Sequence, residues 1–191
     1  MNNTLKNVLL SAILLLPALT TSLAEAKDKE DDKLMFTQKL NDEYIWFDYK
    51  RGMFRAASEK KHALISFCVD EDPFCVKLQE KTFSNPEVKM FMEENFIPVK
   101  VNGKSEYRVD TYKYELEKDL IKKYEIEGYP TIAFVSPDGK NINGLVKGFT
   151  PPEKLMIIMK YISGDHFKKM TLDSFEKREL QAKKKISTKK N

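Results

Sequence analysis

The chain has 191 residues, of which 41% are hydrophobic and 32% are charged, and its formal net charge is +4. Residues 168–191 hold nine Lys or Arg against three Asp or Glu, and the rest of the chain lacks the basic face that nucleic-acid binding requires. Two cysteines form at most one bridge, which excludes a disulfide-stapled scaffold and directs attention to a redox or regulatory role.

The N-terminus carries the pattern of a secretory signal peptide. Lys6 precedes an apolar run over residues 8–19, and Ala24-Glu25-Ala26 fits the small-x-small cleavage rule. The run is too short for a permanent membrane span, so we expect cleavage after Ala26; the alternative is an uncleaved N-terminal anchor. The mature protein is therefore expected to be periplasmic or secreted, in an oxidising compartment.

The spacing of apolar residues predicts one α/β domain over residues 44–163, after a charged linker at 27–43 and before a helical extension and basic tail at 164–191. Its first half contains, in chain order, a helix at 46–61, a buried strand at 63–67, a helix that starts near Pro73, a helix with Asn85 as its N-cap, and a strand at 96–101. Pro98 indicates an edge or a distortion in the last of these strands, because proline cannot donate to a ladder.

The second half of the domain follows a polar, tyrosine-rich loop. The pattern predicts a helix at 115–124 and a hairpin of strands at 132–135 and 142–146. Thr150-Pro151-Pro152-Glu153 has the form of a capping box, followed by an amphipathic helix with Leu155, Ile158, Met159 and Ile162 on its apolar face. A last helix is expected over 171–184, capped by Thr171. This alternation predicts a mixed central sheet with helices on both faces.

Two motifs resemble the thioredoxin superfamily, and most closely its exported bacterial members. Residues 75–83 are similar to the end of the active-site helix pattern C-x-x-C-K-x-L-x-x-x-x-F, and Gly128-Tyr129-Pro130-Thr131 matches the element that follows it. The resemblance covers residues 46–162 and implies a thioredoxin-like fold. In that family the proline is cis and faces the active-site loop. The resemblance therefore implies a cis Pro130, with extended peptides contacting Tyr129, Pro130 and Asp72.

The active-site motif departs from the family pattern at three positions. Counted back from Cys75, Asp72 stands at the place of the first catalytic cysteine, Glu71 at that of an aromatic residue, and Ser66 at that of a buried acid found in many thioredoxins. A dithiol exchanger needs an attacking thiolate and a resolving thiol, and a carboxylate cannot attack a disulfide. We therefore interpret the site as degenerate, with Asp72 as a helix N-cap and Cys75 in the place of the resolving thiol.

Cys68 offers a second sulfur outside the motif. Alternation along a strand puts Ser66 and Cys68 on the same face, and if that face lies under the Pro73 helix, Cys68 approaches Cys75. A bridge requires Cα atoms within about 7 Å. Two alternatives stay open: a Cys68–Cys75 disulfide with a redox function, or two buried free thiols.

No metal site and no cofactor is expected. Asp70, Glu71 and Asp72 form an acidic cluster without the glycine turn and spacing of a calcium loop, and His62 and His166 lack zinc spacing.

The leading functional hypothesis is an exported protein of the thiol–disulfide exchange type with a degenerate site, in which Cys75 and Cys68 are the candidate catalytic residues. Its partners would be an extended peptide or protein substrate and a redox partner protein. The alternative is a non-catalytic peptide-binding or chaperone-like module of the cell envelope. A third option is an envelope scaffold whose basic tail contacts a membrane surface.

Overall fold

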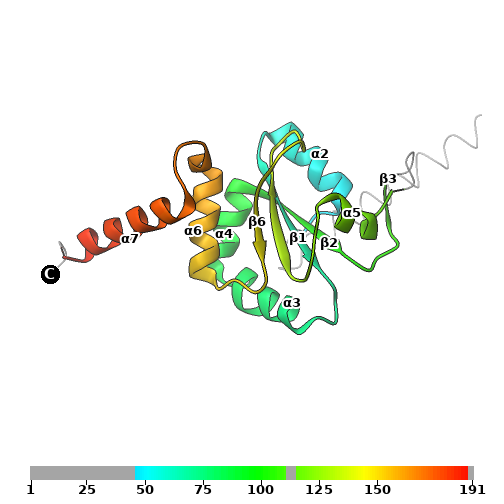
Figure 1. Ribbon diagram of the computed structural model, residues 1–191, viewed down its shortest axis with the longest axis horizontal. Coiled ribbons are helices and arrows are strands. Elements are labelled where there is room, and N and C mark those ends of the chain that lie inside the picture. Colours follow the sequence, from blue (N-terminus) through cyan, green and yellow to red (C-terminus); the bar gives the residue numbers. More distant parts are fainter. Residues whose placement is uncertain (1–45, 111–114, 189–191) are drawn as a thin grey trace, which may run out of the picture. The chain divides into compact units, whose positions relative to one another are not determined.

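A four-stranded mixed sheet forms the centre of the domain (Figure 1). The computed structural model describes residues 46–110 and 115–188. The strands follow the order β2-β1-β5-β6; β1 pairs in parallel with β2 and antiparallel with β5, and β5 pairs antiparallel with β6. Their bounds are β1 (His62–Cys68), β2 (Phe96–Asn102), β5 (Thr131–Val135) and β6 (Ile142–Lys147). The predicted mixed sheet is confirmed, and Pro98 lies on a terminal strand as expected.

Helices flank this sheet, as the sequence predicted. Their bounds are α2 (Tyr49–Glu59), α3 (Pro73–Leu78), α4 (Pro86–Asn95), α5 (Glu117–Lys123), α6 (Pro152–Ser163) and α7 (Leu172–Thr188). A π-helical turn, Gln79–Phe83, continues α3 directly, so the helix that begins at Pro73 runs on past Leu78.

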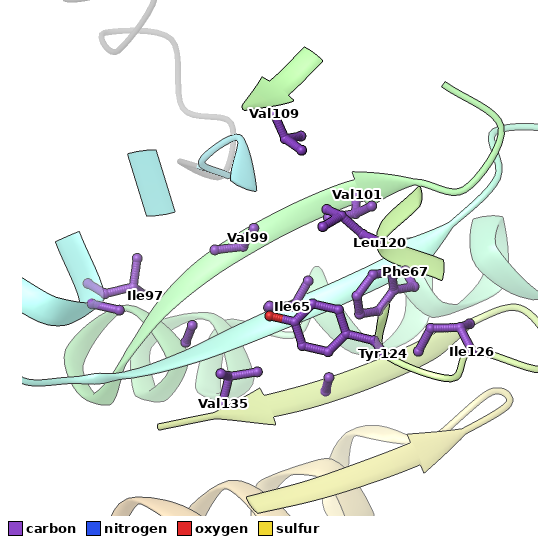
Figure 2. Close-up of a cluster of buried hydrophobic side chains, with 13 residues drawn as sticks. Ile65, Phe67, Ile97, Val99, Val101, Val109, Leu120, Tyr124, Ile126 and Val135 are labelled. Atoms are coloured by element: carbon purple, nitrogen blue, oxygen red, sulfur yellow. The ribbon is translucent and has the colours of Figure 1, made fainter. Parts of the chain in front are cut away.

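One face of the sheet is covered by α2 and α5 over a hydrophobic cluster (Figure 2). Strand β1 contributes Ala63, Ile65 and Phe67 to the cluster, and α5 with the residue after it contributes Leu120 and Tyr124. The Phe67 and Tyr124 ring centroids lie 5.2 Å apart. Because successive strand side chains alternate, the remaining residues of β1 face the other side of the sheet.

The opposite face is packed by α4 and α6. The Phe96 and Phe134 rings meet there, with centroids 5.5 Å apart. The predicted apolar face of α6 is confirmed, because all four of its residues are buried: Leu155, Ile158, Met159 and Ile162.

Two predicted helix starts are confirmed. The Asn85 side chain accepts hydrogen bonds from the backbone N–H groups of Glu87 and Val88, and Pro86 occupies the first position of α4. Thr171 Oγ1 accepts from the Ser174 N–H at 3.3 Å, where α7 begins. Each short polar side chain satisfies N–H groups that the helix itself leaves unpaired.

The predicted capping box at Thr150 is wrong. The N-cap of α6 is Pro151, without a side-chain hydrogen bond. Thr150 is buried instead, and its carbonyl oxygen accepts from Thr82 Oγ1 at 2.6 Å. The Thr150 hydroxyl donates to the Gly148 carbonyl oxygen at 3.4 Å, so it does not cap α6.

The segment around residue 115 also differs from the prediction. Residues Glu115–Leu116 form strand β4, which pairs antiparallel with β3 (Arg108–Asp110), and α5 begins only at Glu117. Asp119 Oδ2 accepts from the Leu116 N–H at the start of α5. A carboxylate cap and a short hairpin therefore shorten the helix expected here.

The C-terminal helix α7 packs on α6 through aromatic residues. Phe175 is buried, and its ring centroid lies 5.5 Å from that of Tyr161 and 4.6 Å from that of His166. No helix in the described part of the chain is both long and apolar enough to cross a membrane. The predicted signal peptide and linker lie outside the described residues, as do the lysine side chains that end the basic tail.

Gly52 on α2 lies directly against strand β2, which yields a stability prediction. A Cβ at this position would overlap the Val99 side chain and lie 3.3 Å from Phe47 Cβ. Gly52→Ala gains about 1 kcal/mol of helix propensity but introduces an overpacking cost of about 1–3 kcal/mol. We expect the overlap to prevail and the free energy of unfolding in urea to fall. Gly128→Ala is the control, since open space surrounds that glycine, and equal stability of the two variants would contradict the packing argument.

Candidate functional site

Cys68 and Cys75 form a disulfide. Cys68 is the last residue of β1 and Cys75 lies in the first turn of α3, and their Cα atoms are 5.7 Å apart. This separation falls within the usual range for a bridge. Of the two alternatives that the sequence left open, the structure therefore contains the disulfide. Both residues are buried, with exposed fractions of 8% for Cys68 and 6% for Cys75.

Asp72 begins α3 as its N-cap. One carboxylate oxygen accepts from the backbone N–H groups of Phe74 and Cys75, each at 2.9 Å, and Pro73 occupies the first helical position. These N–H groups would otherwise be available to stabilise an anion at the start of the helix. The carboxylate thus occupies the start of α3 and adds a negative charge beside Cys75.

Ser66 lies beside the disulfide on strand β1. It lies on β1 two residues before Cys68, on the same face of the sheet, and is 3% exposed. Its hydroxyl donates to Cys68 Sγ at an O···S distance of 3.9 Å. The residue singled out at the place of a buried acid therefore contacts one of the two sulfurs directly.

A second loop holds the end of β1. The Gly103 N–H donates to the Cys68 carbonyl oxygen at 2.9 Å, and Asn102 Nδ2 donates to Asp70 Oδ2 at 2.8 Å. These two bonds fix the loop that connects β1 to α3 against the end of β2. The Asp70 and Asp72 carboxylates thus both accept hydrogen bonds that hold this loop and the start of α3.

The carboxylates around this loop make it a negatively charged neighbourhood. Burial raises the pKa of the Glu117 carboxyl, and Asp48 and Asp70 act in the same direction, against hydrogen bonds from Ser105 and Asn102. A further anion near the loop is therefore disfavoured unless a hydrogen-bond donor reaches it.

The Tyr129–Pro130 segment reaches the loop that follows β2. The Tyr129–Pro130 peptide bond is cis, Pro130 is buried, and its carbonyl oxygen accepts from the Gly148 N–H at 2.8 Å. The Tyr129 ring crosses to the loop after β2, where it lies so close to Gly103 that a Cβ on that glycine would overlap the phenol. Burial raises the pKa of the Tyr129 hydroxyl. Tyr129 therefore contacts the loop that is bonded to Cys68.

Apolar side chains are exposed on the helix that carries Cys75. Phe74 is 56% exposed and Val76 is 44% exposed, and Lys77 Nζ lies 4.4 Å from the centroid of the Phe149 ring. Sequence reasoning missed Phe74, Val76 and Gly103 as parts of the site. The signal for Phe74 was an apolar residue at the first turn of a helix beside an acidic run, whereas the role of Gly103 depends on a tyrosine 26 positions away and had no local signal.

Comparison with known proteins supports the fold described above. A model of the thioredoxin-like domain family matches residues 49–163. Similar solved structures include a thioredoxin from Thermus thermophilus (21% identity, 61% of this chain and 85% of that chain, TM-score 0.51) and the DsbH oxidoreductase (19%, 62% and 82%, 0.50). A thioredoxin-fold protein from Helicobacter pylori is also similar (18%, 70% and 88%, 0.50). At these identities the structures show the shared fold. No curated protein sequence matches the chain.

The cap at Asp72 gives a prediction that separates its hydrogen bonds from its charge. Asp72→Ala leaves the Phe74 and Cys75 N–H groups without their acceptor and should lower the free energy of unfolding of the oxidised protein by about 0.5–2 kcal/mol. Asp72→Asn keeps an equivalent acceptor and should lose little. Urea denaturation measures both variants; an equal loss in the two would show that the charge, and not the cap, supports α3.

Proposed function

Because the chain belongs to the thioredoxin-like domain family and carries a disulfide at the start of α3, we propose that it is an exported thiol–disulfide exchange protein whose redox couple is Cys68–Cys75. The observation that carries this proposal is the bridge itself. It joins the cysteine in the place of the family's resolving thiol to a cysteine on the neighbouring strand. The site is degenerate in that Asp72 stands where the usual nucleophile would be.

The couple would work without an exposed cysteine at the helix N-terminus. A disulfide is opened when a partner thiolate attacks one of its sulfurs and the other sulfur leaves as a thiolate. Both sulfurs belong to the protein's own bridge, so Asp72 need not react. Two candidate substrate-binding features lie near the bridge: the exposed Phe74 and Val76 side chains on the helix of Cys75, and the Tyr129–Pro130 segment, whose tyrosine contacts the loop bonded to Cys68. An extended peptide fits such a surface, since backbone pairing and apolar contact do not require one particular sequence.

Export is part of the proposal. The predicted signal peptide at residues 1–26 would deliver the chain to the periplasm or the exterior, where disulfides persist. A redox role there implies a partner protein that restores the couple to its working state.

Thiol counting tests the redox proposal. Protein collected from an exporting host is alkylated before and after equilibration with small dithiols of graded potential, and its intact mass is measured. We expect no reactive thiol at first and two after reduction, on a chain that begins at Lys27, because each broken bridge releases both sulfurs. A bridge that persists in the folded protein at every potential would overturn the redox function, and a retained N-terminal segment would overturn cleavage at Ala26.

An insulin-reduction assay then tests whether the lack of a cysteine at position 72 limits the activity. The wild type should be a weak reductant, and Asp72→Cys should be faster by roughly tenfold, because a thiol at a helix start has a lowered pKa and a correspondingly larger thiolate fraction. Asp72→Asn is the matched control, since it changes the charge without supplying sulfur. Equal rates in the wild type and Asp72→Cys would contradict the interpretation of position 72.

A non-catalytic peptide-binding module is the second candidate function, and the burial of the bridge favours it. Both cysteines are less than one-tenth exposed, while Phe74 and Val76 beside them are exposed. Such a module would hold extended peptides near Tyr129–Pro130 and keep the disulfide as a structural crosslink.

Gly103→Ala tests the peptide-binding surface in either case. The added Cβ would overlap the Tyr129 ring, which is the movable end of a side chain, so the ring should shift at little cost in stability. We expect weaker binding of unfolded-protein peptides, measured by fluorescence anisotropy, with a nearly unchanged midpoint of thermal unfolding. Gly128→Ala is the matched control, because it alters a nearby glycine in open space. Unchanged binding by Gly103→Ala would remove Tyr129 from the proposed surface.

A further inference from the structure

We propose that the Cys68–Cys75 bridge opens preferentially in one direction: a partner thiolate attacks Cys75, and Cys68 leaves as the thiolate that the Ser66 hydroxyl stabilises. This inference rests on the proposed redox function and adds to it the identity of the attacked sulfur. It also assigns Ser66 a role in the exchange step.

Exposure does not distinguish the two sulfurs, since the residues are 8% and 6% exposed. Their polar surroundings do. Among the described residues, Cys68 Sγ is the one hydrogen-bond partner of the buried Ser66 hydroxyl. A hydroxyl donor next to sulfur favours the anionic form of that sulfur over the neutral form.

The surroundings of Cys75 have the opposite character. The Asp72 carboxylate accepts from the Cys75 N–H, so this backbone donor is already engaged and a negative charge stands beside it. A thiolate on Cys75 would face that charge without a free donor from the same turn. The sulfur with the more stable thiolate is the better leaving group, so cleavage should place the electron pair on Cys68.

The exchange has two steps. A partner thiolate forms a bond to Cys75 Sγ while the Cys75–Cys68 bond breaks, and its electron pair goes to Cys68 Sγ. A second thiolate of the same partner attacks the partner sulfur in this mixed disulfide and releases Cys75 as a thiolate. Cys75 and Cys68 each take a proton from water. The partner dithiol is oxidised to a disulfide, and the protein gains two electrons as its dithiol form.

The direct test maps the mixed disulfide on the wild-type protein. The oxidised chain is mixed briefly with a limiting amount of glutathione, quenched in acid and digested, and the glutathione-bearing cysteine is identified by mass spectrometry. We expect the adduct on Cys75 in excess over Cys68. An adduct mainly on Cys68, or an even distribution, would overturn the assigned direction while leaving the redox function intact. A bridge that no thiol opens would overturn both.

The role of Ser66 is tested by the titration of Cys68. In reduced Cys75→Ala protein, the ultraviolet absorbance of the thiolate reports the fraction of Cys68 ionised at each pH. Adding Ser66→Ala removes the hydroxyl donor and should lower that fraction about three- to tenfold at a fixed pH below the midpoint. Ser66→Thr keeps a hydroxyl and should restore the fraction at least in part.

Thr82→Val is the matched control, because it deletes a buried hydroxyl that donates to the Thr150 carbonyl and not to sulfur. A merely structural Ser66 would affect stability as Thr82 does and would leave the Cys68 titration unchanged. That result, with the bridge still reducible, would remove Ser66 from the exchange step and leave the proposed function standing.

Discussion

The burial of strand β1 on both faces is the constraint on which the site depends. It pairs with β2 on one side and β5 on the other, and all of its residues from Ala63 onward are buried. Strand pleating then fixes which way each side chain points. Because Ile65 and Phe67 enter the cluster under α2 and α5, Ser66 and Cys68 face the opposite layer. A slip of one residue would exchange the two sets, placing a phenylalanine under α3 and the sulfur in the hydrophobic cluster. The position of the disulfide is thus a consequence of core packing.

The Asp72 cap is the second element, and it acts on the chemistry as well as on the fold. A helix start needs acceptors for its first N–H groups, and a carboxylate supplies a better one than a thiol does. The same carboxylate removes from Cys75 the donors that would make its thiolate stable. The carboxylate that secures α3 therefore disfavours a thiolate at Cys75, and the bridge joins Cys75 to the sulfur that β1 presents. Cys68 and Asp72 are best understood as linked features of one site.

Much of this architecture could be predicted from the sequence, because it depends on local rules. The cap at Asn85 and the apolar face of α6 follow from short-range chemistry and helical spacing. The failures have more than one cause. Thr150 fits a capping box, yet its hydroxyl donates to the Gly148 carbonyl oxygen, and α6 begins after Pro151 without a side-chain cap. The packing of Tyr129 on Gly103 and the pairing of β3 with β4 depend on contacts that no local pattern encodes. For the site, strand alternation predicted that Ser66 and Cys68 share one face of the sheet, whereas the layer that this face meets and the bridge itself required the loop length and helix position that only the fold defines.

The bridge is one of several links that hold the loop between β1 and α3. Closing a loop with a sequence separation of seven residues contributes about 2–3 kcal/mol in the chain-entropy description. The Gly103 N–H bond to the Cys68 carbonyl and the Asn102–Asp70 bond do not involve sulfur. We therefore expect the loop to stay attached to the end of β2 in both redox states, with Asp72 still capping α3. Phe74 and Val76 would then remain exposed whether the bridge is open or closed, so peptide binding and electron exchange are separable properties of the same site. That separation explains how one surface can support both candidate functions, and why the reducibility of the bridge, and not the presence of a peptide-binding surface, distinguishes them.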